Sequence, residues 1–187
     1  MRIIAGNFKG RKILEPKDIK TRPLKDLTKE SIFNIINHSN KFKANIRNST
    51  VLDLFSGVGS FGIECLSRGA KHVTFVENYT GVLPILKKNL TNLNMSRRYE
   101  IIDQNILTNF NSLIKKNKFD IVFLDPPYKE KKVALVIDHI SHEKLLKDKG
   151  IVIIHRHKND DENYSKNFKI LETKKYGISK ILFGVLD

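Results

Sequence analysis

Apolar residues from position 49 onward follow two alternating periodicities. Short runs rich in Val, Ile and Phe predict buried strands, and longer stretches with an apolar residue every three or four positions predict helices. The predicted strands cover 51–55, 72–77, 99–102, 119–124 and 151–155, and the predicted helices cover 61–68, 82–93, 106–115 and 133–146. Strands that alternate with helices are typical of a parallel sheet with helices on both faces, so the pattern predicts an α/β, Rossmann-like fold.

Two segments near the carboxyl end depart from this alternation. Residues 168–176 and 179–185 both alternate apolar and polar positions, and they are joined at Gly177. Adjacent strands with a glycine turn between them form antiparallel hairpins. We therefore expect a mostly parallel sheet with a terminal antiparallel hairpin.

The first 48 residues have a different organisation. Short apolar segments at 2–6 and 10–14 flank Phe8, with glycines where a tight hairpin turn needs them. Beyond Pro23, Asp26 can cap a helix that runs to about Asn40. The sequence thus divides into an N-terminal basic extension, residues 1–48, made of a hairpin and a helix, and a main domain, residues 49–187.

Positive charge is concentrated in this extension. The whole chain has a net charge of +14, from 34 Lys and Arg against 20 Asp and Glu, and residues 1–50 hold 12 of the basic and 4 of the acidic residues. Clustered cations attract phosphates, although a packing appendage with solvated lysines would have the same composition. Lys9, Arg11, Lys12 and Arg22 surround Phe8, which favours a surface that follows a nucleic-acid backbone and stacks one base.

The composition argues against several other classes of protein. No run of about 18 apolar residues could span a membrane, and the first residues lack a secretory signal pattern, so we expect a cytoplasmic protein. Cys65 is the only cysteine, which excludes an intramolecular disulfide, and its apolar neighbours predict a buried thiol. The six histidines lack the spacing of zinc ligands, so we expect no metal.

A glycine-rich loop follows the first predicted strand. Gly57, Gly59 and Gly62 form a GxGxxG pattern, and Glu77 ends the next strand 20 residues after Gly57. Glycines let the backbone approach a nucleotide, and a carboxylate at the next strand end can bind ribose hydroxyls. This pattern alone leaves a nicotinamide-dependent oxidoreductase open. Asp53 favours S-adenosylmethionine, because its carboxylate could bind the ammonium group of that cofactor but would repel a pyrophosphate.

A second motif follows the predicted strand 119–124. Asp125-Pro126-Pro127-Tyr128 places a carboxylate, a carbonyl and an aromatic ring on a backbone that two prolines restrict. The exocyclic amine of a base is a poor nucleophile because its lone pair is delocalised into the ring. Hydrogen bonds to Asp125 and to the Pro126 carbonyl would localise that pair, and Tyr128 would stack on the base. The two motifs together predict methyl transfer to an amine.

These motifs resemble those of a known family over nearly the whole chain. The chain resembles the RsmD-type family of bacterial 16S ribosomal RNA guanine-N2 methyltransferases, which are class I S-adenosylmethionine enzymes. The matching segments are 2–6 with 10–12, 22–23 with 30–34, 53–62 with 66–70, and 125–128. The front segments select this family, because the DPPY motif also occurs in DNA adenine-N6 methyltransferases.

The resemblance implies methylation of the N2 amine of a guanine in 16S ribosomal RNA, within a partly assembled small ribosomal subunit. It implies catalytic roles for Asp125, Pro126 and Tyr128. It implies cofactor binding by Asp53, Ser56, Gly57, Gly59 and Glu77, and contact of Asn105 with the adenine amine. A DNA adenine-N6 methyltransferase and a catalytically silent RNA-binding protein remain the alternatives. For a chain of this size we expect a monomer.

Two segments differ from the family pattern. Leu24 and Leu27 stand where the family has a hydroxyl and a guanidinium. Residues 155–158, with the sequence His-Arg-His-Lys, replace a more acidic stretch and predict a basic rim. We expect His155 and His157 to face opposite sides of the strand end.

Overall fold

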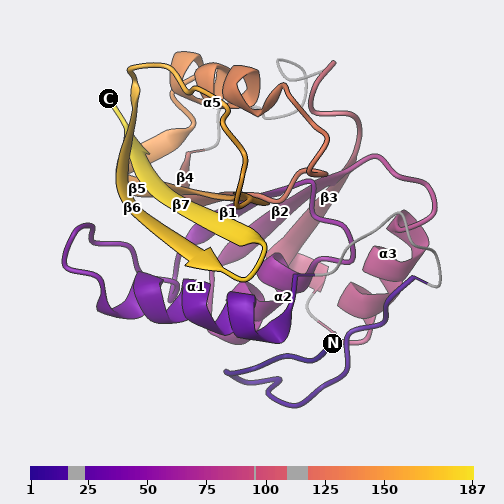
Figure 1. Ribbon diagram of the computed structural model, residues 1–187. Helices are drawn as coiled ribbons and strands as arrows, with labels where there is room; N and C mark the ends of the chain where they lie inside the picture. Colours follow the sequence, from indigo (N-terminus) through magenta and orange to yellow (C-terminus); the bar gives the residue numbers. More distant parts are fainter. Residues whose placement is uncertain (17–23, 95, 109–117) are drawn as a thin grey trace.

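A computed structural model describes residues 1–16, 24–94, 96–108 and 118–187 (Figure 1). In this part of the chain, seven strands form one sheet in the order β3-β2-β1-β4-β5-β7-β6. The strands are β1 Thr50–Leu54, β2 His72–Glu77, β3 Tyr99–Asp103, β4 Phe119–Leu124, β5 Leu146–His157, β6 Phe168–Tyr176 and β7 Ser179–Leu186. The described helices are α1 Asp26–His38, α2 Ser60–Ser67, α3 Leu83–Thr91, the short 3-10 helix Ser96–Arg98 and α5 Val133–His142.

The strand pairing confirms the predicted topology. β1 pairs in parallel with β2 and β4, β2 pairs in parallel with β3, and β4 pairs in parallel with β5. The terminal hairpin of β6 and β7 is antiparallel and joins the sheet through β5. The predicted α/β, Rossmann-like sheet, mostly parallel with a terminal antiparallel hairpin, is confirmed. No helix among the described residues is long and apolar enough to cross a membrane.

Two predicted element boundaries differ from the structure by more than two residues. The helix predicted for 133–146 ends at His142, and β5 already begins at Leu146. The helix ends there because Lys144 has a φ of 51°, which leaves the helical conformation. The helix predicted for 106–115 lies largely outside the described residues.

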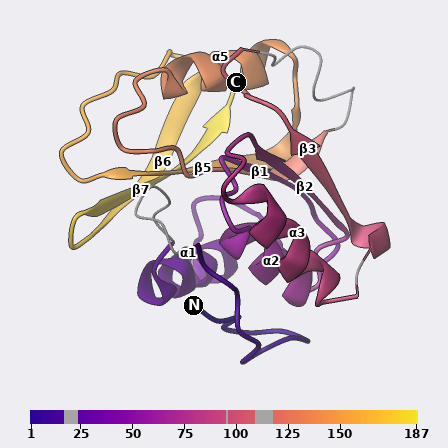
Figure 2. The same cartoon turned by 90° about the vertical axis from the view of Figure 1, so that its right-hand side faces the viewer.

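Helices cover both faces of the sheet (Figures 1 and 2). α1, α2 and α3 lie on one face, and α5 lies on the other. Successive residues of a strand point to opposite faces, so each buried strand contributes to two cores. In β4, Phe123 stacks on Phe61 of α2 with ring centroids 4.0 Å apart, whereas Leu124 packs in the cluster that contains Val136 of α5.

The N-terminal extension packs into the core beneath α1 and α2. Ile3 and Ile13 are each 1% exposed and belong to the same apolar cluster as Ile32 of α1. The predicted hairpin forms as an antiparallel pair of short arms. Arg2 bridges Lys12, and backbone N–H groups donate from Ile3 to Arg11, from Gly10 to Ile3 and from Ile13 to Met1.

Asp26 does not cap α1, so that prediction was wrong by one position. The cap residue is Lys25, and Asp26 is the first residue of the helix. Its carboxylate lies 3.7 Å from the Lys29 ammonium, one turn further along. A negative charge in the first turn still stabilises the positive end of the helix dipole.

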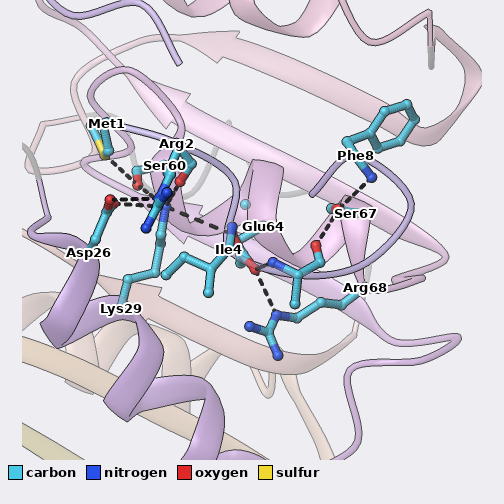
Figure 3. A network of polar contacts seen from close by, with 12 residues as sticks. Met1, Arg2, Ile4, Phe8, Asp26, Lys29, Ser60, Glu64, Ser67 and Arg68 are labelled. Carbon is cyan, nitrogen blue, oxygen red and sulfur yellow. Dashed lines mark hydrogen bonds and ion pairs between the residues drawn. The ribbon is translucent and has the colours of Figure 1, made fainter. Parts of the chain in front are cut away.

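A buried polar network ties the extension to α2 (Figure 3). Glu64 is fully buried and accepts hydrogen bonds from the backbone N–H groups of Ile4, at 2.8 Å, and Ala5, at 2.9 Å. Arg68 donates to the same carboxylate at 2.8 Å. Lys29, also fully buried, lies 3.7 Å from Glu64 and donates to the Arg2 carbonyl at 2.7 Å. These contacts fix the position of α2, whose first residue borders the candidate site.

Candidate active site

The loop between β1 and α2 turns sharply through residues with positive φ. Phe55 has a φ of 57°, Gly57 of 55° and Gly59 of 82°. The Ser56 N–H donates to the Val76 carbonyl at 3.1 Å, and the Gly59 N–H donates to the Ser56 carbonyl at 2.8 Å. The loop thereby directs the amino end of α2 toward the carboxyl ends of β1 and β4.

The glycines of this loop have different roles. A Cβ on Gly57 would meet nothing within 4 Å, because this residue borders a cavity. A Cβ on Gly59 would lie 2.5 Å from a methyl group of Leu86, and one on Gly62 would lie 2.3 Å from the ring of Phe75. Gly59 and Gly62 therefore allow α2 to pack closely on α3 and β2. Of the three, only Gly57 has space for a ligand beside it.

Glu77 at the end of β2 holds the neighbouring loops. Its Oε2 atom accepts the Gly57 N–H at 2.7 Å, and its Oε1 atom accepts the Asn78 and Tyr79 N–H groups at 2.8 Å each. A carboxylate offers about four acceptor positions, so about one remains for a ligand hydroxyl.

Asp53 lies in the floor of the site. The residue is only 1% exposed, and its Oδ2 atom accepts a hydrogen bond from the Gly62 N–H at 2.9 Å. Burial raises the pKa of this carboxyl group well above its usual range. A cationic group bound beside Asp53 would offset this effect, because it would stabilise the ionised form.

The DPPY tetrapeptide follows β4, and hydrogen bonds from Arg156 hold its backbone in place. The Arg156 guanidinium donates to the Pro127 carbonyl at 3.3 Å and to the Glu130 carbonyl at 2.7 Å. It is fully buried and forms ion pairs with Asp160, at 2.8 Å, and Glu162, at 3.4 Å. The predicted basic rim at 155–158 is thus wrong for Arg156, whose charge is internal and neutralised.

His155 contacts this tetrapeptide directly. Its Nδ1 atom lies 2.7 Å from Asp125 Oδ1, and its Nε2 atom lies 2.9 Å from Ser179 Oγ. The rings of His155 and His157 both approach Tyr128 edge-on, with centroid distances of 5.9 and 5.2 Å. The expectation that the two histidines face opposite sides was wrong, because residues two apart in a strand share a face.

Both motifs line one cavity of about 480 Å³, which is in the range of small-molecule sites. Of the predicted site residues, the structure brings together Asp53, Ser56, Gly57, Glu77, Asp125, Pro126 and Tyr128 around it. Pro16 and Leu24 of the extension also line it. Sequence reasoning missed Phe55, Asn78 and Tyr79 as lining residues. Phe55 ends one predicted strand, and Asn78 and Tyr79 are the first two residues after another, where ligands bind in this class of fold.

Other predicted site residues lie outside the cavity lining. Gly59 supports packing, as described above, and the Asn105 Oδ1 atom accepts the Leu107 N–H at 2.9 Å in a turn after β3. Arg11 covers the ring of Phe8 and donates to the carbonyl of Asn92, beyond the end of α3. Lys9 and Lys12 lie in the same N-terminal hairpin as Arg11, and Arg22 lies outside the described residues.

The contact of Phe8 with α2 shows how far this part of the extension lies from the cavity. Its N–H donates to Ser67 at the last residue of α2, whereas Ser60 at the first residue lines the cavity. Seven helical steps separate Ser60 from Ser67, so the two places are about 10 Å apart along the helix. Among the described residues, no group of three His, Cys, Asp or Glu side chains could hold a metal ion.

Comparison with known proteins identifies the family. A family model described as "Conserved hypothetical protein 95" matches residues 1–185. The protein named ribosomal RNA small subunit methyltransferase D of Haemophilus influenzae (strain ATCC 51907 / DSM 11121 / KW20 / Rd) is 35% identical over 179 residues, which cover 95% of this chain and 90% of that protein. The chain belongs to the RsmD family.

Another relative and two solved structures are also similar to this chain. The protein of the same name from Buchnera aphidicola subsp. Acyrthosiphon pisum (strain APS) is 33% identical over 92% of this chain and 86% of its own length. The solved structure of yhhF from Escherichia coli superposes with a TM-score of 0.83 at 26% identity, covering 100% of this chain and 98% of that one. HI0767 from Haemophilus influenzae gives a TM-score of 0.77 at 34% identity, with the same coverage of 100% and 98%.

Proposed function

We propose that this protein transfers a methyl group from S-adenosylmethionine to the N2 amine of a guanine in 16S ribosomal RNA. One observation carries the proposal: residues suited to a nucleoside cofactor and residues suited to an aromatic amine line the same cavity. Membership of the RsmD family makes the protein an S-adenosylmethionine-dependent ribosomal RNA methyltransferase. The guanine, its N2 atom and the small-subunit RNA are the finer steps that we add.

The residues of the cavity fit S-adenosylmethionine, which supplies a methyl group on a positively charged sulfur when it is bound. Asp53 would bind its ammonium group, and Gly57 leaves space beside the backbone. Ser56 Oγ is buried and has no hydrogen-bond partner among the described residues, so it is available to a polar ligand. Glu77 retains about one acceptor position for a ribose hydroxyl.

Asp125, Pro126 and Tyr128 would hold the base. Asp125 and the Pro126 carbonyl would accept hydrogen bonds from the two N–H groups of the amine, which localises the nitrogen lone pair, and Tyr128 would stack on the ring. With the cofactor bound, the lone pair would form the new N–C bond while the electron pair of the broken C–S bond returned to sulfur, and one nitrogen proton would pass to Asp125 and then to water. Most of the acceleration then comes from positioning, since no strong base is needed.

The extension would contact the RNA backbone. The hairpin that carries Lys9, Arg11 and Lys12 contacts α2 through Phe8 at Ser67, about 10 Å along the helix from the cavity. RNA that places a guanine in the cavity could continue along α2 to reach these cations. We expect the substrate to be a partly assembled small ribosomal subunit, methylated in the cytoplasm by a monomer.

Substitution of Asp125 tests the proposed site. Asp125→Asn keeps the size of the side chain but exchanges one acceptor oxygen for a donor, so we expect methyl transfer to fall by at least about a hundredfold. Cofactor affinity, measured by calorimetry, should stay near that of the wild type. Asp138→Asn on the exposed face of α5 is the matched control and should retain full turnover. Normal turnover of Asp125→Asn would disprove the assigned role.

A further inference from the structure

His155 has both ring nitrogens engaged within the candidate site. It is 4% exposed, lies on β5 and lines the cavity beside Asp125. Nδ1 lies 2.7 Å from Asp125 Oδ1, and Nε2 lies 2.9 Å from Ser179 Oγ on β7. Ser179 is 4% exposed, and its Oγ atom also lies 3.3 Å from the Tyr128 hydroxyl. The imidazole thus connects the first residue of the DPPY motif to its last.

The chemistry of the partners fixes the direction of these hydrogen bonds. An ionised carboxylate only accepts, so Nδ1 must carry a proton that it donates to Asp125. In a neutral imidazole Nε2 is then an acceptor, and the Ser179 hydroxyl donates to it. The Ser179 oxygen in turn can accept from Tyr128. Donation therefore runs from Tyr128 through Ser179 and His155 to Asp125.

This arrangement restricts Asp125 in a way that matters for an incoming amine. His155 donates to Oδ1, so the carboxylate cannot rotate freely, and the acceptor positions that remain for a substrate hydrogen have a fixed direction. The same series of hydrogen bonds restrains the hydroxyl group of Tyr128. Asp125 is the first residue of the tetrapeptide and Tyr128 is the last. One histidine thereby orients both side chains that would hold the base.

We propose that His155 is a positioning residue for methyl transfer, which holds Asp125 through Nδ1–H and Tyr128 through Ser179. This inference rests on the proposed function, because it assumes that Asp125 and Tyr128 hold the target base. His155 touches neither the methyl donor nor the amine in this account. Its loss should therefore lower the rate of transfer without weakening the binding of S-adenosylmethionine.

Two variants of His155 separate positioning from packing. His155→Leu removes both hydrogen bonds, and a misplaced carboxylate should lower kcat by about a hundredfold. KM for the RNA particle and the cofactor dissociation constant should stay within about twofold of the wild-type values, because His155 does not contribute to the binding of either substrate in the ground state. His155→Asn restores an N–H group near the position of Nδ1 and should recover activity to within about tenfold of the wild type. His142→Asn, whose imidazole is exposed at the end of α5, is the matched control.

The protonation of the ring gives a readout that does not depend on turnover. Nitrogen NMR of the full-length protein, with His155 assigned from the His155→Asn variant, should show a protonated Nδ1. A ring protonated only at Nε2 would overturn the inference whatever the substrate is. Unchanged kcat in a folded His155→Leu variant would also overturn it, as would an Asn variant that is as impaired as the Leu variant.

The proposed function and this inference fail in different experiments. If the wild-type protein labels no guanine in any substrate, the proposed function is wrong, and the NMR result still decides which atom of His155 carries the proton. If the wild type labels guanine and His155→Leu does so equally well, only the positioning role is wrong.

Discussion

Asp53 combines a buried carboxyl group with a place in the cavity wall. Because burial raises its pKa, the neutral form is favoured in the free protein at pH values where an exposed aspartate, with a pKa of about 3.9, is ionised. In the window between that value and the raised pKa, the folded state holds a proton that the unfolded state has lost. Stability of the free protein should therefore decrease as pH rises through this window.

Cofactor binding should reverse this preference at Asp53. The ammonium group of S-adenosylmethionine is attracted to the ionised carboxylate, so affinity should rise as pH rises through the window, and binding should release protons. Calorimetry in two buffers of different ionisation enthalpy measures this release. Asp53→Asn should lose about 10- to 100-fold in affinity and the proton release together. Equal proton release by wild type and Asp53→Asn would contradict the assignment of Asp53.

Gly57 and Gly59 should respond differently to the same substitution. Gly57→Ala introduces only the strain of a positive φ, about 1–2 kcal/mol, because nothing lies within 4 Å of the new atom. Gly59→Ala adds a clash with Leu86 and should lower the free energy of unfolding by about 1–3 kcal/mol more. Urea denaturation compares the two variants. Although Gly57→Ala is the more stable of the two variants, it should bind S-adenosylmethionine more weakly than the wild type does. Equal stabilities of the two variants would show that packing does not distinguish these glycines.

At the scale of elements, the Lys29–Glu64 network joins α1 and the extension to α2. Lys29→Met should lower the free energy of unfolding by about 3 kcal/mol, because it leaves the Arg2 carbonyl without its donor and removes a buried cation that pairs with Glu64. The exposed control Lys87→Met on α3 should change it by less than about 0.5 kcal/mol. Chemical denaturation measures both. A Lys29→Met variant as stable as the wild type would show that apolar packing alone holds α1 in place.

Element types were predictable wherever local pattern and burial agree. β2 and β4 have the predicted bounds because their apolar runs are buried on both faces. The start of β5 was missed because its first residues, Leu146 to Gly150, are mostly polar, and of these only Leu146 pairs with β4 before the register shifts. The N-terminal hairpin forms as predicted, but the packing of its isoleucines against the helices was not predicted, because sequence pattern does not show which surface a short apolar segment will meet.

The candidate site was predictable in part for a related reason. Asp53, Glu77 and Asp125 stand at strand ends, where the fold itself brings ligand-binding residues together. Arg156 and His155 were interpreted as surface groups, because their roles depend on partners that the fold brings close from elsewhere in the sequence. Asp160 and Glu162 neutralise the first, and Ser179 of another strand binds the second.

At the scale of the whole molecule, a net charge of +14 should make RNA binding strongly salt-dependent. Each phosphate contact should contribute about 0.7–0.9 to the negative slope of log affinity against log salt concentration. We expect the triple variant of Lys9, Arg11 and Lys12 to Ser to have a shallower slope in filter binding. Substitution of Lys144 and Lys149, exposed beside the start of β5, should leave it unchanged. Equal slopes for all proteins would exclude the extension as an RNA-binding surface.

The identity of the methylated nucleoside tests the central claim most directly. The purified protein is incubated with labelled S-adenosylmethionine and, in parallel, with naked 16S RNA, small-subunit particles that lack the modification, and duplex DNA. After digestion, the account predicts label in N2-methylguanosine from RNA or particles. Label in N6-methyladenine from DNA, or no label in any of the three substrates, would contradict it.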